Sequence, residues 1–532
     1  MASPVRIESL PARPLRMIDT ESIVAKLVEH GRFPHPVEKI ECIETHASWV
    51  ILAGDFAYKI KKPLDLGFLD YSTPQRRREM CEAEVRLNRR TAPEIYVAVV
   101  GVYGGAEPRI GPLDGAEEFA VRMRRFDQAD VFANRLASGQ LDAAHVDALA
   151  VHVATFHAVA AVAQPHEGFG TADKVVAPAR QNFEQLRERV TDAALLECIG
   201  RLEAWSDAQA KRLTPRFEAR LAEGRVRECH GDLHLSNVVL LDGAPRLFDG
   251  IEFNPQFRWA DVMADVAFLV MDCEARGRED LASRFLDAWL EASGDYAGLE
   301  LLLWYVVYRA MVRAKVAAIR MDQGDEASRA ELARYLEYAL ARIEPRTGCV
   351  WIASGPSGSG KSYNGRKLVA LRGAVRIRSD VERKRLAGLK ATERATAAVG
   401  EGLYGAEMTR RTYARLIEVA RKVVAAGRPA LVDATFLKRA QRDRFRALAR
   451  ELNVPFAILA FDAPVAVLRE RVARRAAEGT DAADADVAVL EHQLAAREPL
   501  EENERGETVG VDTSEELDWE VVLARLDALT VQ

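Results

Sequence analysis

Two phosphate-binding sequence patterns of unrelated design lie on this chain, and they constrain its fold more than any other feature. The first is His-Gly-Asp-Leu-His-Leu-Ser-Asn at 230–237, followed by Leu-Phe-Asp-Gly at 247–250. The second is Gly-Pro-Ser-Gly-Ser-Gly-Lys-Ser at 355–362. Because the two patterns hold a nucleotide in different ways, neither is an internal repeat of the other. We therefore expect two kinase-type domains joined end to end.

The size and composition of the chain agree with several domains in a reducing compartment. Its 532 residues exceed what one hydrophobic core normally supports. The six cysteines form no Cys-x-x-Cys pair, which argues against a disulfide framework and a zinc site. The N-terminal residues lack the apolar core of a secretory signal, and the sparsely charged stretch 148–166 fits a buried helix better than a membrane span. We expect a cytoplasmic protein with no membrane partner.

Apolar periodicity divides the chain. Short apolar runs at 40–125 predict an antiparallel sheet with a helix over 73–90, and 140–340 is mostly helical apart from a hairpin at 226–254. Beyond the helix-breaking segment 344–348, strands alternate with helices, which predicts a parallel sheet flanked by helices. The fold class is thus multidomain α/β: a helical N-terminal extension at 1–39, a two-lobed α+β protein-kinase-like domain at 40–345, and a P-loop domain at 346–532.

The first motif has the spacing of a kinase catalytic loop. Asp232 and Asn237 reproduce the Asp-x-x-x-x-Asn pattern, in which the aspartate takes the acceptor proton and the asparagine binds Mg²⁺. Asp249 follows a predicted strand and precedes a glycine, where a kinase places its second metal ligand. The motif therefore predicts an ATP and Mg²⁺ site.

Such a site also needs a lysine on a strand and a glutamate on a helix. Phe56, Tyr58 and Ile60 share one strand face, so Lys59 and Lys61 share the other. Lys59 directly follows the apolar run, and we predict that it binds the phosphates. Its partner is predicted to be Glu84 in the 73–90 helix, with Glu82 as the alternative.

At these residues the chain resembles the aminoglycoside phosphotransferase and choline kinase group. The matching blocks are 230–237 and Phe-Asp-Gly-Ile-Glu-Phe-Asn-Pro at 248–255, and a looser resemblance covers about 40–340. It implies Asp232 as the base and Asn237 and Asp249 as metal ligands. It also implies a hinge beside the adenine at 122–126.

The same resemblance implies that Asp261 and Asp265 are structural aspartates. His157 and His234 fit packing or hydrogen bonding better than catalysis. One departure concerns the phosphate cover, since no Gly-x-Gly-x-x-Gly precedes Lys59 and Thr-His-Ala-Ser at 45–48 would have to replace it. The departure counts against a protein kinase more than against a small-molecule kinase.

The second motif is a P-loop in the expected context, between an apolar strand and a helical run. Its glycines allow backbone N–H groups to point at phosphate oxygens, Lys361 reaches the β- and γ-phosphates, and Ser362 ligates Mg²⁺. The predicted nucleotide-binding residues are Gly355, Pro356, Ser357, Gly358, Ser359, Gly360, Lys361 and Ser362.

Polar residues after the next strands complete this second site. Asp380 lies at the carboxyl edge of the predicted sheet and could activate an acceptor hydroxyl, with Arg383 holding the acceptor or a nearby anion. Asp433 ends another strand and is a candidate magnesium group, although capping of the following helix is a nearly equal alternative. The last predicted ATP-binding residues are the arginines of a lid, Arg471 and Arg475.

The second half resembles small P-loop kinases such as gluconate kinases, polynucleotide kinases and the zeta-toxin group. The Asp-x-x-Arg pattern at 380–383 is similar to the acceptor site of polynucleotide kinases. The whole arrangement resembles a bacterial family that fuses a phosphotransferase-like domain to an AAA-labelled P-loop domain, and no feature of an AAA motor follows 461.

Three functional hypotheses remain open. The first is an enzyme with two ATP-dependent sites that phosphorylate hydroxyl groups of small, sugar-like or metabolite acceptors. The second is one active kinase regulated by a nucleotide-binding partner domain. The third is a stress or toxin-like kinase acting on nucleotide sugars or nucleic-acid ends; its support is the 346–450 segment, where 24 Lys and Arg stand against 8 Asp and Glu. Solvated helix surface explains that segment equally well.

Overall fold

The computed structural model describes residues 19–65, 67, 69–322, 324–391, 393, 402–478 and 486–530. Of the helical extension predicted at 1–39, residues 1–18 lie outside that description. The chain divides into two compact units, one formed by Met1–Asp127 with Phe248–Pro255 and the other by Gln128–Leu247 with Gln256–Gln532. The short segment Phe248–Pro255 therefore packs with the N-terminal unit, although it follows the first motif in sequence.

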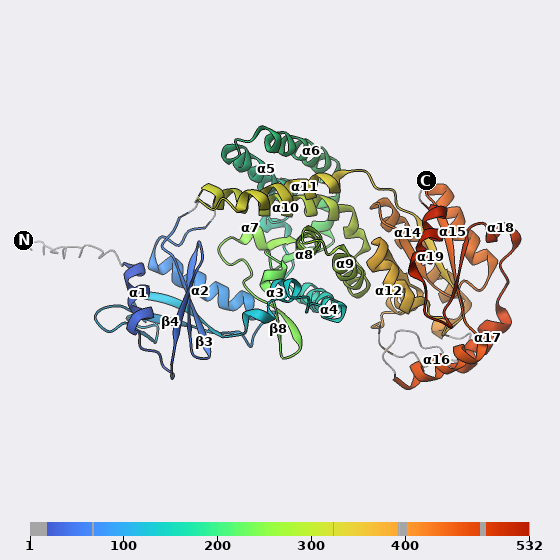
Figure 1. The fold of residues 1–532 in the computed structure, drawn as a ribbon, viewed down its shortest axis with the longest axis horizontal. Coiled ribbons are helices and arrows are strands. Elements are labelled where there is room, and N and C mark those ends of the chain that lie inside the picture. Colours follow the sequence, from blue (N-terminus) through green and yellow to red (C-terminus); the bar gives the residue numbers. More distant parts are fainter. Residues whose placement is uncertain are drawn as a thin grey trace, which may run out of the picture. The chain divides into compact units, whose positions relative to one another are not determined.

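The first unit is built on an antiparallel sheet of six strands (blue in Figure 1). Helix α1 (Thr20–His30) packs on it through Ile23, Val24 and Leu27, and α2 (Pro74–Asn88) begins where Thr73 accepts a hydrogen bond from the backbone N–H of Arg76. The strands, in their spatial order, are β1 (Ile40–Glu44), β2 (Ser48–Ala53), β3 (Phe56–Lys61), β6 (Glu118–Arg124), β4 (Tyr96–Tyr103) and β5 (Arg109–Gly111).

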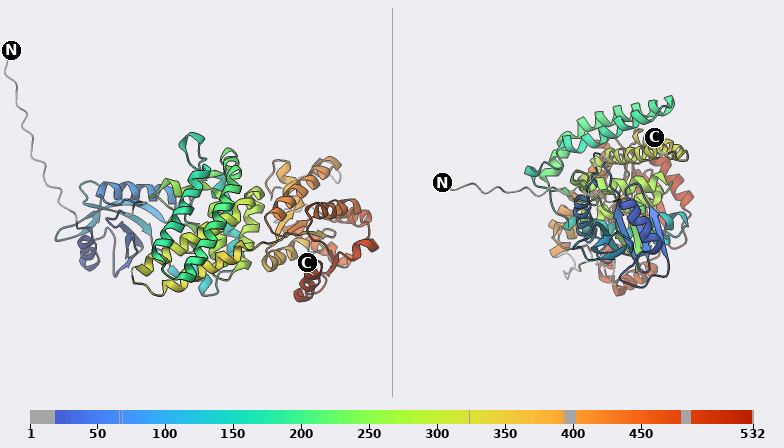
Figure 2. Two further views of the ribbon diagram at one scale, coloured as in Figure 1. Left: turned by 90° about the horizontal axis from the view of Figure 1, so that it is seen from above. Right: turned by 90° about the vertical axis from the view of Figure 1, so that its left-hand side faces the viewer.

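The second unit begins with a helical part. Its centre is α8 (Val262–Ala275), which is buried from Val262 to Glu274 and is therefore mostly apolar all round, its charged residues being buried carboxylates with partners. Helices α5 and α6 lie side by side (Figures 1 and 2). The other helices around α8 are α3 (Phe132–Ala137), α4 (Ala143–Val159), α5 (Ala172–Arg189), α6 (Ala193–Ala222), α7 (Pro255–Arg258), α9 (Glu279–Ser293), α10 (Leu299–Asp322) and α11 (Ser328–Ile343).

Two small antiparallel pairs interrupt these helices, β7 (Val226–Glu228) with β10 (Trp259–Asp261) and β8 (Val238–Leu241) with β9 (Ala244–Leu247). They flank the 230–237 motif on both sides. None of the helices in the described part combines the length and the apolar character that crossing a membrane requires.

The remainder of the second unit contains a five-stranded parallel sheet. Alternate residues of β11 pack into different hydrophobic clusters, Val350 and Ile352 into one and Trp351 and Ala353 into the other, because helices cover both faces. The strands, in spatial order, are β12 (Val375–Arg378), β13 (Ala430–Asp433), β11 (Val350–Ser354), β14 (Phe456–Asp462) and β15 (Thr508–Asp512). This is the parallel sheet flanked by helices that the sequence predicts.

One or more helices follow each strand of this part, and Figure 1 labels most of them from α12 to α19. Their bounds are α12 (Lys361–Arg372), α13 (Ser379–Leu386), α14 (Ala406–Ala425), α15 (Arg439–Leu452), α16 (Val465–Glu478), α17 (Val487–Ala496), α18 (Glu502–Arg505) and α19 (Trp519–Thr530). The topology brings the carboxyl ends of β11, β12 and β13 to one edge of the sheet, where the P-loop also lies.

Candidate phosphotransfer sites

A buried glutamate of the first unit, Glu84, lies between two lysines. Lys59 Nζ donates to Glu84 Oε1 at 2.9 Å, and Lys61 Nζ donates to Glu84 Oε2 at 2.6 Å. Burial alone would raise the pKa of Glu84, but the two ammonium groups hold it well below its usual value. The alternative partner, Glu82, instead accepts from Arg78 at 3.0 Å on the exposed side of α2. The structure thus brings together Lys59 and Glu84.

Asp249 lies beside the same lysine, with 2.5 Å between Lys59 Nζ and Asp249 Oδ1. Its backbone is left-handed (φ 61°), a conformation that costs a non-glycine residue energy. Two neighbours hold it there: the Asp249 N–H donates to the Tyr96 hydroxyl at 2.9 Å, and the Gly250 N–H donates to Asn88 Oδ1 at 2.7 Å. The carboxylate itself is 45% exposed, so it can reach a ligand.

Lys61 has a second partner that sequence reasoning missed. Its ammonium group, which is fully buried, also donates to Glu252, and the Tyr71 hydroxyl donates to the same carboxylate. Glu252 belongs to the Phe248–Pro255 segment, so this ion pair fastens that segment to β3. The pair explains why the segment packs with the first unit and how Asp249 is delivered to Lys59.

The second unit contains the catalytic-loop motif, between β7 and β8. Asn237 Nδ2 donates to the Asp232 backbone oxygen at 2.9 Å and to Asp232 Oδ2 at 3.1 Å. His234 Nε2 lies 3.3 Å from the same carboxylate. Burial would raise the pKa of Asp232, but His234 holds it below its usual value. The structure therefore brings the predicted base and the predicted metal ligand together.

Two buried aspartates of α8 accept hydrogen bonds from the backbone of this loop. Asp265 accepts from the backbone N–H groups of His230 at 2.8 Å and Gly231 at 2.9 Å, and Asp272 accepts from the Leu235 N–H at 2.9 Å. Because a fully buried carboxylate is stable only when its oxygens are satisfied, these bonds fix the loop in one conformation. Asp261 instead pairs with buried Arg220, at 2.5 Å.

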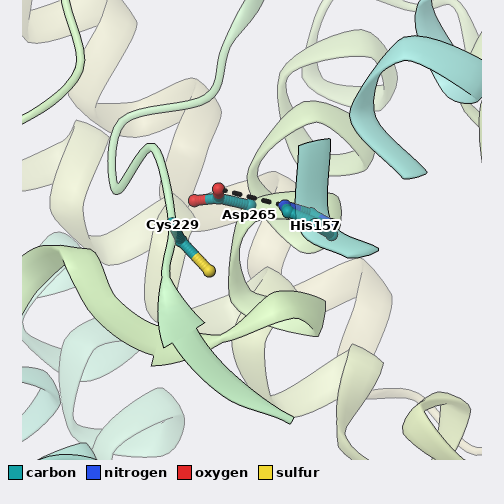
Figure 3. A group of neighbouring side chains, drawn as sticks. All are labelled: His157, Cys229 and Asp265. Atoms are coloured by element: carbon teal, nitrogen blue, oxygen red, sulfur yellow. Dashed lines mark hydrogen bonds and ion pairs between the residues drawn. The ribbon is translucent and has the colours of Figure 1, made fainter. Parts of the chain in front are cut away.

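His157, Cys229 and Asp265 form a buried group that offers three potential metal-ligand atoms within 4.8 Å of one another (Figure 3). Each atom already has a partner within the protein. His157 Nε2 lies 3.3 Å from Asp265 Oδ2, both Asp265 oxygens accept backbone N–H groups of the loop, and the Cys229 thiol donates to the Ala260 carbonyl at 3.3 Å. These contacts show that the three side chains hold the 230–237 loop in place.

The P-loop connects β11 to α12 with backbone angles that require glycine. Gly355 has φ 150° and Gly358 has φ 81°. A Cβ atom would lie 2.3 Å from the Phe461 carbonyl oxygen at the first position and 2.7 Å from the Leu468 carbonyl oxygen at the second. Lys361 Nζ donates to the carbonyls of Gly355 at 2.7 Å and Pro356 at 2.9 Å, across the loop.

The two predicted magnesium ligands of the second site join α12 to β13. Ser362 Oγ donates to Asp433 Oδ2 at 2.7 Å, at the carboxyl end of β13. A hydroxyl and a carboxylate in contact are the hard oxygen donors that Mg²⁺ prefers, so both residues fit that ion. Burial lowers the pKa of the Lys361 ammonium to about 8, although Asp433 and Asp380 oppose the shift.

The predicted acceptor-side residues lie at the end of β12, where α13 begins. Arg383 Nη1 is 3.2 Å from Asp380 Oδ1, and its guanidinium carbon is 5.1 Å from the centre of the Tyr404 ring. A single cavity of about 1110 Å³ holds these groups together with predicted phosphate-binding residues. The predicted residues that line it are Ser357, Gly358, Gly360, Lys361, Ser362, Asp380, Arg383, Asp433, Arg471 and Arg475.

Two further residues of this cavity were not predicted. The Ser357 N–H donates to Gln493 Oε1 of α17 at 2.7 Å, and Arg471 donates to Thr513 Oγ1 at 2.9 Å and to the Thr513 carbonyl at 2.7 Å. Arg471 thereby links α16 to the end of β15. No short motif marks Gln493 or Thr513, because their position depends on how helices pack beyond the sheet.

Family models match both halves of the chain. The model described as "Phosphotransferase enzyme family" matches residues 68–302, and the model described as "AAA domain" matches residues 350–500. Both predicted site motifs fall inside these ranges. Phosphotransfer with ATP is the chemistry of kinase families of this kind, and they typically use Mg²⁺.

Solved structures similar to the chain come from both groups of kinases. A choline/ethanolamine kinase family protein from Mesorhizobium loti is 14% identical, covering 61% of this chain and 95% of its own, with a TM-score of 0.39. Aminoglycoside 2'-phosphotransferase-IIIa in its GDP complex is 15% identical, covering 60% and 97%, with a TM-score of 0.36. A gluconokinase from Sinorhizobium meliloti 1021 is 24% identical, covering 35% and 96%, with a TM-score of 0.25.

Relatives in mycobacteria span nearly the whole chain. "Uncharacterized protein Rv2004c" of Mycobacterium tuberculosis and "Uncharacterized protein Mb2027c" of Mycobacterium bovis are each 32% identical over 470 residues, covering 87% of this chain and 92% of their own. The chain therefore belongs to the family of these mycobacterial proteins, a fusion of an aminoglycoside phosphotransferase/choline kinase-like domain with a P-loop ATP-binding domain.

Proposed function

We propose that the chain carries two ATP-dependent phosphotransfer sites, each transferring the γ-phosphate of ATP to a hydroxyl group of a small molecule. The observation that carries this proposal is the cavity at the P-loop. It brings together the residues proposed to bind phosphate, to ligate metal and to face the acceptor, whereas nucleotide binding alone needs no carboxylate such as Asp380. For the first site the support is the sequence motif, which predicts the same three kinds of group.

At the first site, Lys59 is the cation for the inner phosphates, and Glu84 orients it. Asn237 and Asp249 would hold Mg²⁺, which neutralises charge on the phosphates when bound. Asp232 accepts a hydrogen bond from the acceptor hydroxyl and orients it. A bond forms between that oxygen and the γ-phosphorus, the bond to the β,γ-bridging oxygen breaks, ADP leaves, and the hydroxyl proton passes to Asp232. With its lowered pKa, Asp232 remains a carboxylate until the proton is released late in the transfer.

At the second site, the P-loop N–H groups and Lys361 hold the β- and γ-phosphates. Ser362 and Asp433 would hold Mg²⁺. Asp380 is the group at the acceptor hydroxyl, and Arg471 and Arg475 lie on the same cavity as the candidates for stabilising transferred charge. The balance of the reaction is the same as at the first site, with Asp380 receiving the proton.

Arg383 points to the class of acceptor at the second site. Its guanidinium is charged at all relevant pH values, is only 12% exposed, pairs with Asp380 and lies over the Tyr404 ring. A planar cation held in this way can bind an anionic group of the acceptor in addition to Asp380. The acceptor that fits is a small hydroxylated molecule with a carboxylate or phosphate.

The nucleic-acid alternative loses support from the basic segment. Several of its arginines pair with acidic residues that follow it in sequence: Arg421 with Glu451 at 2.7 Å, Arg442 with Glu504 at 2.7 Å, and Arg446 with Glu507 at 2.7 Å. Arginines that are neutralised in this way offer little charge to a polyanion.

The test uses Asp232→Asn and Lys361→Ala separately in the full chain, with ATP consumption measured over a pool of hydroxylated metabolites. Two sites predict that each variant loses consumption with a different set of acceptors and keeps the rest. Loss of all consumption in one variant, with the other indistinguishable from wild type, would instead establish a single active kinase with a regulatory partner domain.

A further inference from the structure

Helix α9 belongs to the phosphotransferase-family part of the chain, yet its charged side chains contact the P-loop part. It lies inside the 68–302 match, and Phe285, Leu286, Trp289 and Leu290 bury one side of it in the helical core. Its other side meets α12 and β12, which lie inside the 350–500 match (Figure 1). All three elements belong to the same compact unit.

Arg376 of β12 is the centre of this contact. Its guanidinium donates to Glu291 Oε2 at 3.0 Å through Nη2, and its backbone N–H donates to Asp287 Oδ1 at 2.6 Å. The side chain is only 4% exposed, and its stem passes Gly365 of α12, where a Cβ atom would come within 3.2 Å of the Arg376 Cδ. The arginine is therefore fixed by two carboxylates of α9.

The same guanidinium reaches the second phosphotransfer site. Arg376 Nη1 donates to the backbone carbonyl of Ser362 at 3.0 Å, and the hydroxyl of Ser362 bonds to Asp433. Glu291 also accepts from Arg378 at 3.3 Å, two residues before Asp380. Glu291 thus contacts two arginines: Arg376, which bonds to Ser362, and Arg378, which lies just before Asp380 in the sequence.

We propose that Glu291 and Asp287 are positioning residues of the P-loop site, acting through Arg376 on the backbone of Ser362. They touch neither nucleotide nor acceptor. Their effect is to hold the Ser362 hydroxyl against Asp433, so that both oxygens face Mg²⁺ together. The proposal rests on the proposed function of this site. It means that the P-loop domain depends on the phosphotransferase domain for the geometry of its metal ligands.

The experiment measures nucleotide affinity by calorimetry in the full chain, with Lys59→Ala present throughout so that binding at the first site is suppressed. Each variant is titrated with ATP in Mg²⁺ and with ATP in EDTA. We expect Glu291→Gln and Arg376→Lys each to weaken MgATP binding about three- to tenfold, the range expected for an indirect contact, and to leave metal-free ATP binding within about twofold. The double variant should be no weaker than the worse single one, because both substitutions break the same link.

Asp280→Asn is the matched control, since Asp280 is a carboxylate of the same helix whose ion pair is with Arg278, a residue outside the P-loop part. It should leave both affinities unchanged. Asp287→Asn is a second, independent variant and should act in the same direction as Glu291→Gln. Equal losses with and without Mg²⁺, additive effects of the two substitutions, or unchanged MgATP affinity would each overturn the proposal. These readouts are binding constants, so they remain interpretable if no phosphoryl transfer is found and the proposed function fails.

Discussion

Replacing Tyr96 by phenylalanine removes one oxygen atom from the first site and should disturb its metal ligand. The Tyr96 hydroxyl accepts the backbone N–H of Asp249 at 2.9 Å, and Asp249 stands at φ 61°. Without that acceptor, the left-handed backbone conformation of Asp249 loses a hydrogen bond that stabilises it. We expect Asp249 to leave its position beside Lys59 for part of the time, and the Mg²⁺ affinity of the site to fall accordingly.

The magnitude follows from two costs. A backbone N–H that loses its acceptor costs about 1–3 kcal/mol, and because this N–H is only partly buried the lower half of that range applies. A left-handed non-glycine residue adds a cost of about 1 kcal/mol that the wild-type contacts already offset. A loss of about 1–2 kcal/mol corresponds to a fall in affinity of about 5- to 30-fold.

The assay is displacement of a fluorescent ATP analogue at a series of Mg²⁺ concentrations, in a chain whose P-loop site is silenced by Lys361→Ala. Tyr103→Phe is the matched control, since Tyr103 ends the same strand and, among the described residues, its hydroxyl bonds to the exposed carbonyls of Pro112 and Asp114. The reasoning is refuted if Tyr96→Phe keeps the wild-type Mg²⁺ dependence, or if both substitutions change it equally.

Three further predictions concern the second unit. Burial lowers the pKa of Lys361 to about 8, and ATP binds the protonated ammonium. ATP affinity at the P-loop should therefore be constant below pH 8 and fall by up to about tenfold per pH unit above it. Calorimetry in a Lys59→Ala chain can measure this change. Gly358→Ala should lower the unfolding temperature more than Gly243→Ala, because both glycines are left-handed but a Cβ meets the Leu468 carbonyl only at the first. Burial raises the pKa of Asp287 to about 7, above its value in the unfolded chain. The free energy of unfolding should therefore fall by about 1.4 kcal/mol per pH unit from about pH 4 to pH 7. Urea unfolding of Asp287→Asn should show a flatter pH dependence, and an unchanged slope would contradict this assignment.

The order of the elements and the identity of both motifs are readable from the sequence because their signals are local. The alternation in β3 predicts that Lys59 and Lys61 share a face, and the structure places both beside Glu84. The strand–loop–helix context of 350–372 likewise predicts where the P-loop lies. In each case the period of the backbone and a short motif spacing are sufficient, without knowledge of distant contacts.

The contacts that hold the residues of the two sites in place could not be predicted from the sequence. Lys61 and Glu252 are 191 residues apart, Tyr96 and Asp249 are 153 apart, and Arg376 and Glu291 are 85 apart. No periodicity relates such positions, and lysine, tyrosine and arginine are common on ordinary surfaces. Their partners depend on which elements pack together.

The sequence by itself determined that this chain has two nucleotide-binding motifs and the strands and helices that carry them, and it predicted the residues proposed to bind phosphate and metal. The tertiary structure decided which buried charges hold those residues in place: Glu252 for the Asp249 segment, Asp265 for the catalytic loop, and Glu291 with Arg376 for the P-loop serine. The physical reason is that a motif is specified by neighbours along the chain, whereas a buried ion must be satisfied by whatever charge the completed fold brings within a few ångströms.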